Sequence, residues 1–228
     1  MSETIRIPPT LVGMSTSQRR LSIAAASGVA LLFLSACTTG PGTSPAPTST
    51  TASSEQRIED ARPDLPEGRV IGVGTVLDVG GDVQLCMGAI MESSPPQCDG
   101  VPVDGWSWDD VEGRESSGET TWGAYAVYAT YDGERLTNTD PPIMLALFDP
   151  IAPEDPTDGV DGTTPPGELS RIQDDISARL GDEAVTLRTD RGYVWLDVVW
   201  DDGTIQDAAD AEYGDGVVIV TSALREID

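Results

Sequence analysis

The side chains that could carry out chemistry in this 228-residue chain are mainly its 39 carboxylates and its three cysteines. Histidine is absent and all 13 basic residues are arginine, so the chain has no imidazole base and no lysine amine. This composition excludes serine–histidine and cysteine–histidine pairs, Schiff-base formation on lysine, and zinc sites built on histidine. A pair of carboxylates could still hydrolyse a glycosidic bond, one as general acid and the other as base or nucleophile.

No spacing sets two of the acidic residues apart from the others, so the sequence indicates no catalytic residue. We therefore expect a protein that is not an enzyme and that uses no metal and no cofactor. A carboxylate-dependent hydrolase acting on cell-wall glycan is the alternative.

The first cysteine, Cys37, follows a segment with the features of a secretory signal peptide. Two arginines precede an uncharged, largely apolar run over residues 21–34. This run is too short for a comfortable membrane span, which needs about 20 apolar residues, and has the length of a signal-peptide hydrophobic region. We expect residues 1–36 to be the signal peptide, with Met14 as the possible true start of translation.

Residues 34–37, Leu-Ser-Ala-Cys, resemble the lipobox of bacterial lipoproteins. The resemblance implies that the Cys37 thiol becomes a diacylglyceryl thioether with palmitate-type acyl chains, and that signal peptidase II cuts before it. Two acyl chains anchor a protein stably, whereas a single chain binds a membrane only marginally. The expected location is the extracytoplasmic face of the cell membrane, with the membrane as a partner through Cys37. An ordinary signal peptide, with Cys37 near the cut by chance, is the alternative.

Residues 37–68 have the composition of a lipid-anchored tether. The stretch from residue 38 to residue 54 is almost entirely Thr, Ser, Pro, Gly and Ala, which cannot bury a core. Removal of residues 1–36 takes away three arginines and one acid, so the net charge changes from −26 to −28. No segment is basic, so we expect no binding to nucleic acid and repulsion from anionic envelope polymers.

The other two cysteines, Cys86 and Cys98, are predicted to form a disulfide. An even pair in an exported domain is most simply oxidised, and closing this loop would contribute about 3 kcal/mol in the chain-entropy model. Two reduced, buried cysteines are the alternative. A redox-active pair is disfavoured because the spacing is not Cys-x-x-Cys.

The segment around these cysteines, residues 85–108, resembles a pattern of uncharacterised exported lipoproteins of high-GC Gram-positive bacteria. The pattern is Cys-x-Gly, then Glu-Ser-x-Pro-Pro-Gln-Cys, then a Gly-Trp-x-Trp strand. The resemblance implies no activity. A recognition edge on this segment would consist of Glu92, Ser93, Gln97, Trp106 and Trp108. We favour the alternative, in which the disulfide holds a connection between strands and the tryptophans pack in the core.

Two further sets of side chains have possible binding chemistry, and for each we favour a structural role. An aromatic platform for sugars would use Trp106, Trp108, Trp122, Tyr125 and Tyr128, which strand alternation should place partly in a core. A calcium site would use Asp149, Glu154, Asp155, Asp158 and Asp161, whose spacing does not match an EF-hand loop.

The elements that must position these residues indicate an α+β protein. Residues 69–148 contain short alternating runs between turn residues, which predicts a small all-β barrel or sandwich with an OB-like barrel as one candidate. Residues 149–166 form an acidic linker rich in proline and glycine. Residues 167–228 predict a two-layer αββαβ module with both helices on one face and the last strand parallel to the strand before it. Within this module, Thr204 is predicted to open the second helix through a capping-box variant.

These observations predict a non-enzymatic, lipid-anchored protein of the cell envelope with a binding or accessory role. Its partner would be an unidentified envelope protein or ligand, and we expect the protein to be monomeric.

Overall fold

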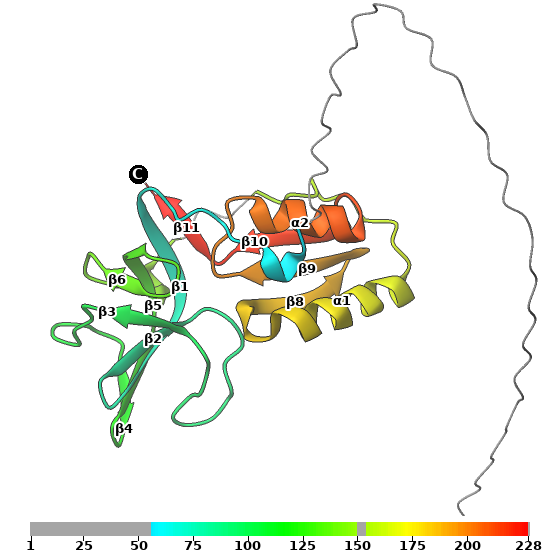
Figure 1. The fold of residues 1–228 in the computed structure, drawn as a ribbon. Coiled ribbons are helices and arrows are strands. Elements are labelled where there is room, and N and C mark those ends of the chain that lie inside the picture. Colours follow the sequence, from blue (N-terminus) through cyan, green and yellow to red (C-terminus); the bar gives the residue numbers. More distant parts are fainter. Residues whose placement is uncertain (1–55, 150–153, 228) are drawn as a thin grey trace, which may run out of the picture. The chain divides into compact units, whose positions relative to one another are not determined.

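Two sheets and two α-helices make up the fold, which is α+β (Figure 1). The computed structural model describes residues 56–149 and 154–227. Cys37, the signal peptide and most of the predicted tether lie outside the described residues.

The larger sheet comes mainly from the first half of the described chain. Its strands are β1 (Arg69–Val79), β2 (Asp82–Cys86), β3 (Val101–Asp104), β4 (Glu115–Ser117), β5 (Thr120–Tyr131), β6 (Leu136–Asn138), β7 (Ile143–Met144) and β11 (Leu224–Ile227). The second part of the chain contains α1 (Pro166–Leu180), β8 (Ala184–Asp190), β9 (Tyr193–Val198), α2 (Thr204–Tyr213) and β10 (Val218–Ser222). Three short 3-10 helices are η1 (Ile58–Asp60), η2 (Leu145–Leu147) and η3 (Gly181–Glu183).

Five strands of the larger sheet close into a barrel in the order β1–β2–β3–β6–β5, with β5 pairing back to β1. The neighbouring strands are antiparallel except for β3 and β6, which are parallel. On one side β1 pairs first with β11 and then with β2, and the change of partner falls between Gly72 and Thr75. A side chain at Gly74 would collide with the carbonyl oxygen of Cys86, so this close approach of two strands requires glycine.

The barrel interior is filled by apolar side chains from all five strands and from β11. The buried set is Val70, Val76, Leu85, Val103, Tyr125, Val127, Ala129, Leu136 and Leu224. On β1 the even-numbered residues supply this core, as the two-residue period of a strand requires.

The second sheet has the order β10–β9–β8, and β10 runs parallel to β9 as the sequence predicted. Both helices cover one face, because side chains of α1 and α2 share a core with alternate residues of β9. That core contains Leu169, Ile172, Ile176, Leu180, Val194, Leu196, Val198, Ala209 and Val218.

The start of α2 differs from the prediction. Thr204 is the first residue of the helix, and the N-cap residue is Gly203, which has no side chain to form a capping bond. The carboxylate of Asp201 instead accepts hydrogen bonds from the backbone N–H groups of Ile205 at 2.8 Å and Gln206 at 3.3 Å. Asp201 therefore satisfies two of the N–H groups that a helix start leaves free.

The folded region begins earlier than residue 69, so the predicted tether does not extend to residue 68. Residues 56–65, here called the strap, lie beside the helices of the second module (Figure 1). Ile58 of the strap is 2% exposed and belongs to the core between α1, α2 and β9. The indole N–H of Trp200 also donates to the carbonyl oxygen of Asp64 at 2.9 Å.

The C-terminal end departs from the predicted αββαβ module. After β10 the chain continues into β11, which pairs with β1 of the barrel sheet (Figure 1). Leu224 of β11 is 1% exposed and lies in the barrel core. The barrel sheet is therefore completed by the last residues of the described chain.

The described part of the predicted linker packs on the β8–β9 turn. Asp155 pairs with Arg191 at 3.0 Å, and the N–H of Gly162 donates to the carbonyl oxygen of Arg191 at 2.8 Å. Thr157, 9% exposed, binds the Asp155 carboxylate through its hydroxyl group. These contacts hold the chain as it approaches α1, which begins at Pro166.

Candidate functional site

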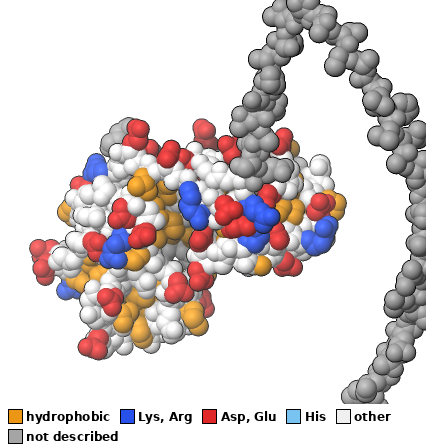
Figure 2. All heavy atoms as spheres, viewed as in Figure 1, with side chains coloured by type: hydrophobic (Ala, Val, Ile, Leu, Met, Phe, Trp, Pro, Cys, Tyr) orange, Lys and Arg blue, Asp and Glu red, His pale blue; other side chains and the backbone are white. Residues whose placement is uncertain are grey.

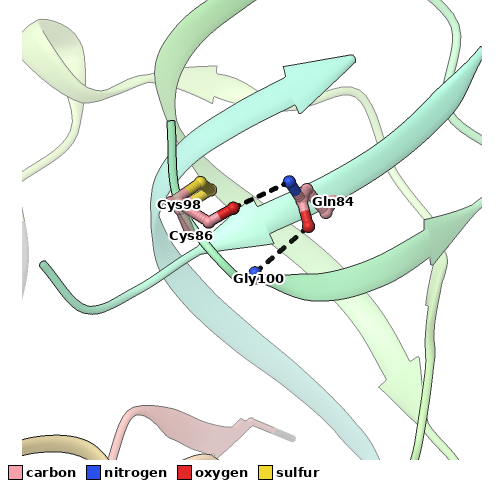
Figure 3. The surroundings of a disulfide bond; sticks show 4 residues. All are labelled: Gln84, Cys86, Cys98 and Gly100. Carbon is pink, nitrogen blue, oxygen red and sulfur yellow. Dashed lines mark hydrogen bonds between the residues drawn. A yellow bond between two sulfur atoms is a disulfide. The ribbon is translucent and has the colours of Figure 1, made fainter. Parts of the chain in front are cut away.

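The two cysteines of the barrel lie at disulfide distance, with Cα atoms 6.1 Å apart (Figure 3). They join the end of β2 to the start of the segment that leads into β3. The side chain of Gln84 reinforces this junction, because it donates to the carbonyl oxygen of Cys98 at 3.2 Å and accepts from the N–H of Gly100 at 3.1 Å (Figure 3). The base of the loop from Cys86 to Cys98 is thus fixed by covalent and polar contacts.

The tip of this loop is held by its own backbone. The N–H of Met91 donates to the carbonyl oxygen of Gln97 at 2.9 Å, and the N–H of Ser93 donates to Met91 at 2.8 Å. The Ser93 hydroxyl donates to the carbonyl oxygen of Pro95 at 2.8 Å. The loop therefore presents Met91, which is 63% exposed, from an ordered backbone.

The tryptophans predicted for a recognition edge pack against the barrel core. Trp106 and Trp108 meet edge to face at 5.2 Å, and both lie about 6 Å from the ring of Tyr125. Tyr125 is only 1% exposed, and Trp108 donates its indole N–H to Asp78 at 2.7 Å. A flat aromatic platform that includes Tyr125 is therefore not formed.

Glu92 and Ser93 share a hollow with a different tryptophan. Together with Met91 and with Trp122 of β5 they line a hollow of about 640 Å³. The structure thus brings part of the predicted edge together with Trp122 in place of Trp106 and Trp108.

A second hollow, of about 780 Å³, adjoins the first at Met144, which lines both. We call the two hollows together the Met144 groove. Its lining mixes polar and apolar side chains, and we call the large apolar ones the floor: Val111, Trp122, Ile143, Met144 and Leu147. We call the acidic residues of the lining the rim: Glu92, Asp109, Asp110, Glu112, Glu115 and Asp140.

The acidic residues of the groove differ in whether a cation neutralises them. Asp140 accepts a hydrogen bond from Arg69 at 2.6 Å. Within residues 56–149 and 154–227, the other five carboxylates of the rim have no ion pair. Arg114, which lies in the chain among these carboxylates, donates to the carbonyl oxygen of Trp108 and not to a carboxylate. The groove therefore combines exposed apolar side chains with an excess of negative charge.

Sequence reasoning missed the Met144 groove. The alternating runs over residues 69–148 predicted strands up to the end of this range, but only Ile143 and Met144 pair with β5 there. The 3-10 helix η2 follows, and its Leu147 is 72% exposed. The doublet Asp109–Asp110 was a sequence signal for a turn, because aspartate is common in turns and tolerates a positive φ. In the structure, Asp110 has φ 60°.

A network around Arg179 joins the strap to both helices. Its guanidinium binds Glu59 of the strap, Asp175 of α1 at 3.0 Å and Glu212 of α2 at 2.8 Å. The Tyr213 hydroxyl accepts from Arg179 at 2.9 Å and donates to Asp175 at 2.7 Å. The hydrogen bond from Arg179 lowers the pKa of Glu59 from its ordinary value.

The open face of the second sheet carries a second polar cluster. Asp197, on the central strand, accepts hydrogen bonds from the hydroxyl groups of Thr186 and Thr221 on the two neighbouring strands. The guanidinium groups of Arg188 and Arg191 lie over the Trp195 ring, 5.1 and 5.5 Å from its centroid. The hydrogen bonds of Asp197 and the cation–π contacts of Trp195 are made within the sheet, so we interpret the cluster as structural.

Among residues 56–149 and 154–227, the carboxyl pKa values that are clearly displaced are lowered. Hydrogen bonds from arginine, hydroxyl or backbone N–H groups lower the pKa of Glu59, Asp104, Asp132, Asp155, Asp175 and Asp202. A general acid of a glycosidase needs the opposite, a carboxyl pKa raised toward neutrality.

The acidic residues considered for calcium do not gather around a common point. Asp155 is engaged by Thr157 and Arg191. In the part of the chain that the structure describes, no group of three or more acidic or cysteine side chains is arranged to hold a metal ion. No helix among the described residues is long and apolar enough to cross a membrane.

Comparisons with models of protein families, with curated proteins and with solved structures found no match to this chain.

Proposed function

We propose that this chain is a lipid-anchored protein of the cell envelope that acts by binding and not by catalysis. Its anchor would be the diacylglyceryl group on Cys37, and the residues between Cys37 and the strap would hold the folded region away from the membrane. The folded region would act as a monomer on the extracytoplasmic face.

The observation that carries the binding role is the Met144 groove. Large exposed apolar side chains that line a groove, as Met91 and Leu147 do here, are typical of a contact surface. The polar clusters elsewhere, around Arg179 and Asp197, are closed by their own hydrogen bonds and leave fewer groups free for a ligand. Acidic side chains are scattered over the face drawn in Figure 2, which also agrees with a dispersed surface charge.

We also propose that the barrel is OB-like. Its support is the strand order, a closed five-stranded barrel in which β3 and β6 are the parallel pair. OB barrels bind ligands on an outer face and through their loops. The Met144 groove uses β5, the disulfide loop and the segment before β4, so it would be a variation on that arrangement.

The six carboxyl groups with a lowered pKa are held in the charged form, so none of these six suits the role of general acid. A hydrolase of wall glycan would need one carboxyl group that stays protonated near neutral pH. The purified mature protein should therefore release no fragments from wall glycan. Glycan turnover that a single Asp or Glu substitution abolishes would overturn this part of the proposal.

The anchor is tested by replacing Cys37 with Ser. In the expressing bacterium, we expect the wild-type protein in the membrane fraction, and Cys37→Ser either in the medium or retained as an uncleaved precursor. Unchanged fractionation of Cys37→Ser as a processed protein would overturn lipid anchoring. Cys86→Ser is the control, because it removes a cysteine without touching the proposed lipid site.

A further inference from the structure

The Met144 groove exposes large apolar side chains on both sides of Met144. Leu147 is 72% exposed and Met91 is 63% exposed, and Met91 is held at the tip of the disulfide loop. Methionine is flexible and polarisable, so it adapts to different apolar partners. Burial of such side chains from water would favour association.

The charge of the groove restricts the partner. Asp109, Asp110 and Glu112 line the larger hollow, and Glu92 and Glu115 line the smaller one. None of these five side chains has an ion pair with an arginine within the described ranges: Arg69 pairs with Asp140, and Arg114 donates to the carbonyl oxygen of Trp108. With these two arginines counted against its six acidic residues, the groove remains acidic. An anionic partner would be repelled, and a cationic partner would be attracted.

The size of the groove favours a protein segment over a small cation. Each hollow alone falls within the range of pockets for drug-sized ligands, roughly 300–1,000 Å³. The two hollows adjoin at Met144, so an occupant of both must extend beyond one such ligand. The carboxylates do not converge as a metal site requires in the described part of the chain.

We propose that the Met144 groove binds an extended basic segment of another envelope protein. Apolar side chains of that segment would lie on the floor beside Met144 and Leu147, and its arginine or lysine side chains would face the carboxylates of the rim. This inference rests on the proposed binding role and adds the chemical class of the partner.

The test uses three heptapeptides with the mature chain carrying Cys37→Ser, so that the result does not depend on lipidation. One peptide alternates Arg and Leu, one alternates Arg and Ser, and one alternates Glu and Leu. Binding is measured by calorimetry and located by backbone amide chemical shifts. We expect the Arg–Leu peptide to bind most tightly and to shift the amides of Met144, Leu147 and Asp110.

A matched pair of triple variants separates the groove from overall charge. The rim variant is Asp109→Asn, Asp110→Asn and Glu112→Gln. The control variant makes the same change in charge on exposed acids of the linker and of α1, Asp161→Asn, Glu168→Gln and Asp174→Asn. The rim variant should weaken the Arg–Leu peptide about tenfold, since three partly screened charge pairs are removed. The control variant should change the affinity less than about twofold.

The variant Leu147→Ser tests the apolar floor, because this side chain is exposed and its replacement should leave the fold intact. It should weaken binding of the Arg–Leu peptide and leave binding of the Arg–Ser peptide unchanged.

Equal effects of the two triple variants, or amide shifts outside the groove, would overturn the assigned site. Tighter binding of the Glu–Leu peptide at the groove would overturn the basic partner while keeping the binding role. Absence of groove shifts with every peptide would overturn the groove as a peptide site, whereas Cys37→Ser fractionation tests the anchor separately.

Discussion

Replacement of Ile58 with Ala tests whether the strap belongs to the folded region. The Ile58 side chain is 2% exposed and packs with α1, α2 and β9. The substitution removes three carbon atoms, which at about 0.8 kcal/mol each corresponds to roughly 2.4 kcal/mol of lost burial. A residual cavity adds to this loss, although the short strap can partly close it, so we expect the free energy of unfolding to fall by about 3 kcal/mol.

The measurement is urea unfolding of the mature chain, supported by thermal melting. The slope of the unfolding free energy against urea concentration should be the same for the variant and the wild type. For a folded region of this size, the expected decrease in melting temperature is on the order of 6–12 °C. Leu65→Ala is the matched control, because Leu65 lies in the same strap but is 53% exposed. It should change the free energy by less than about 1 kcal/mol. Equal effects of the two variants would show that residues 56–65 do not pack as described.

Three other substitutions test further contacts. Arg179→Met should lower the free energy of unfolding by about 1–2 kcal/mol, because three carboxylates lose a partly exposed shared cation; an unchanged urea midpoint would contradict the network. Since Arg179 holds the pKa of Glu59 below its ordinary 4.5, this stabilisation is present above that pH and is lost as the pH falls below it, and Arg179→Met should flatten that part of the stability profile. Cys86→Ser should cost about 3 kcal/mol, and a reducing agent should affect the wild type but not the variant. Leu224→Ala should cost about 3 kcal/mol because β11 completes the barrel core; a loss below about 1 kcal/mol would mean that β11 is peripheral.

The regular elements could be predicted because their patterns are local. The helical spacing of Leu169, Ile172, Ile176 and Leu180 follows one face of α1, and all four side chains are buried. The apolar run after the Arg191–Gly192 turn became the central strand β9. Both patterns, the helical spacing of α1 and the apolar run of β9, involve residues that are close in the sequence.

The parts that were missed depend on long-range contacts. Ile58 is flanked by charged residues, and its burial is decided by helices of which the first begins at residue 166. Leu224 follows a complete αββαβ pattern, and only the open side of β1 explains why it forms another strand. A local sequence pattern does not show which distant helix or strand a residue will pack against.

The Met144 groove was missed for the same reason. Most of its carboxylates come from the disulfide loop and from residues 109–115, whereas Asp140 and Met144 follow later in the chain. The predicted edge contained Glu92 and Ser93 but paired them with tryptophans that the barrel uses for packing. Alternation alone could not decide which aromatic residue faces the loop.

The most direct test of the proposed anchored binding protein is the intact mass of the chain extracted from the membrane fraction of the expressing bacterium. We predict a chain that begins at Cys37 and carries a diacylglyceryl group on that residue. A chain with unmodified Cys37, or one that retains residues upstream of Cys37, would contradict the proposal.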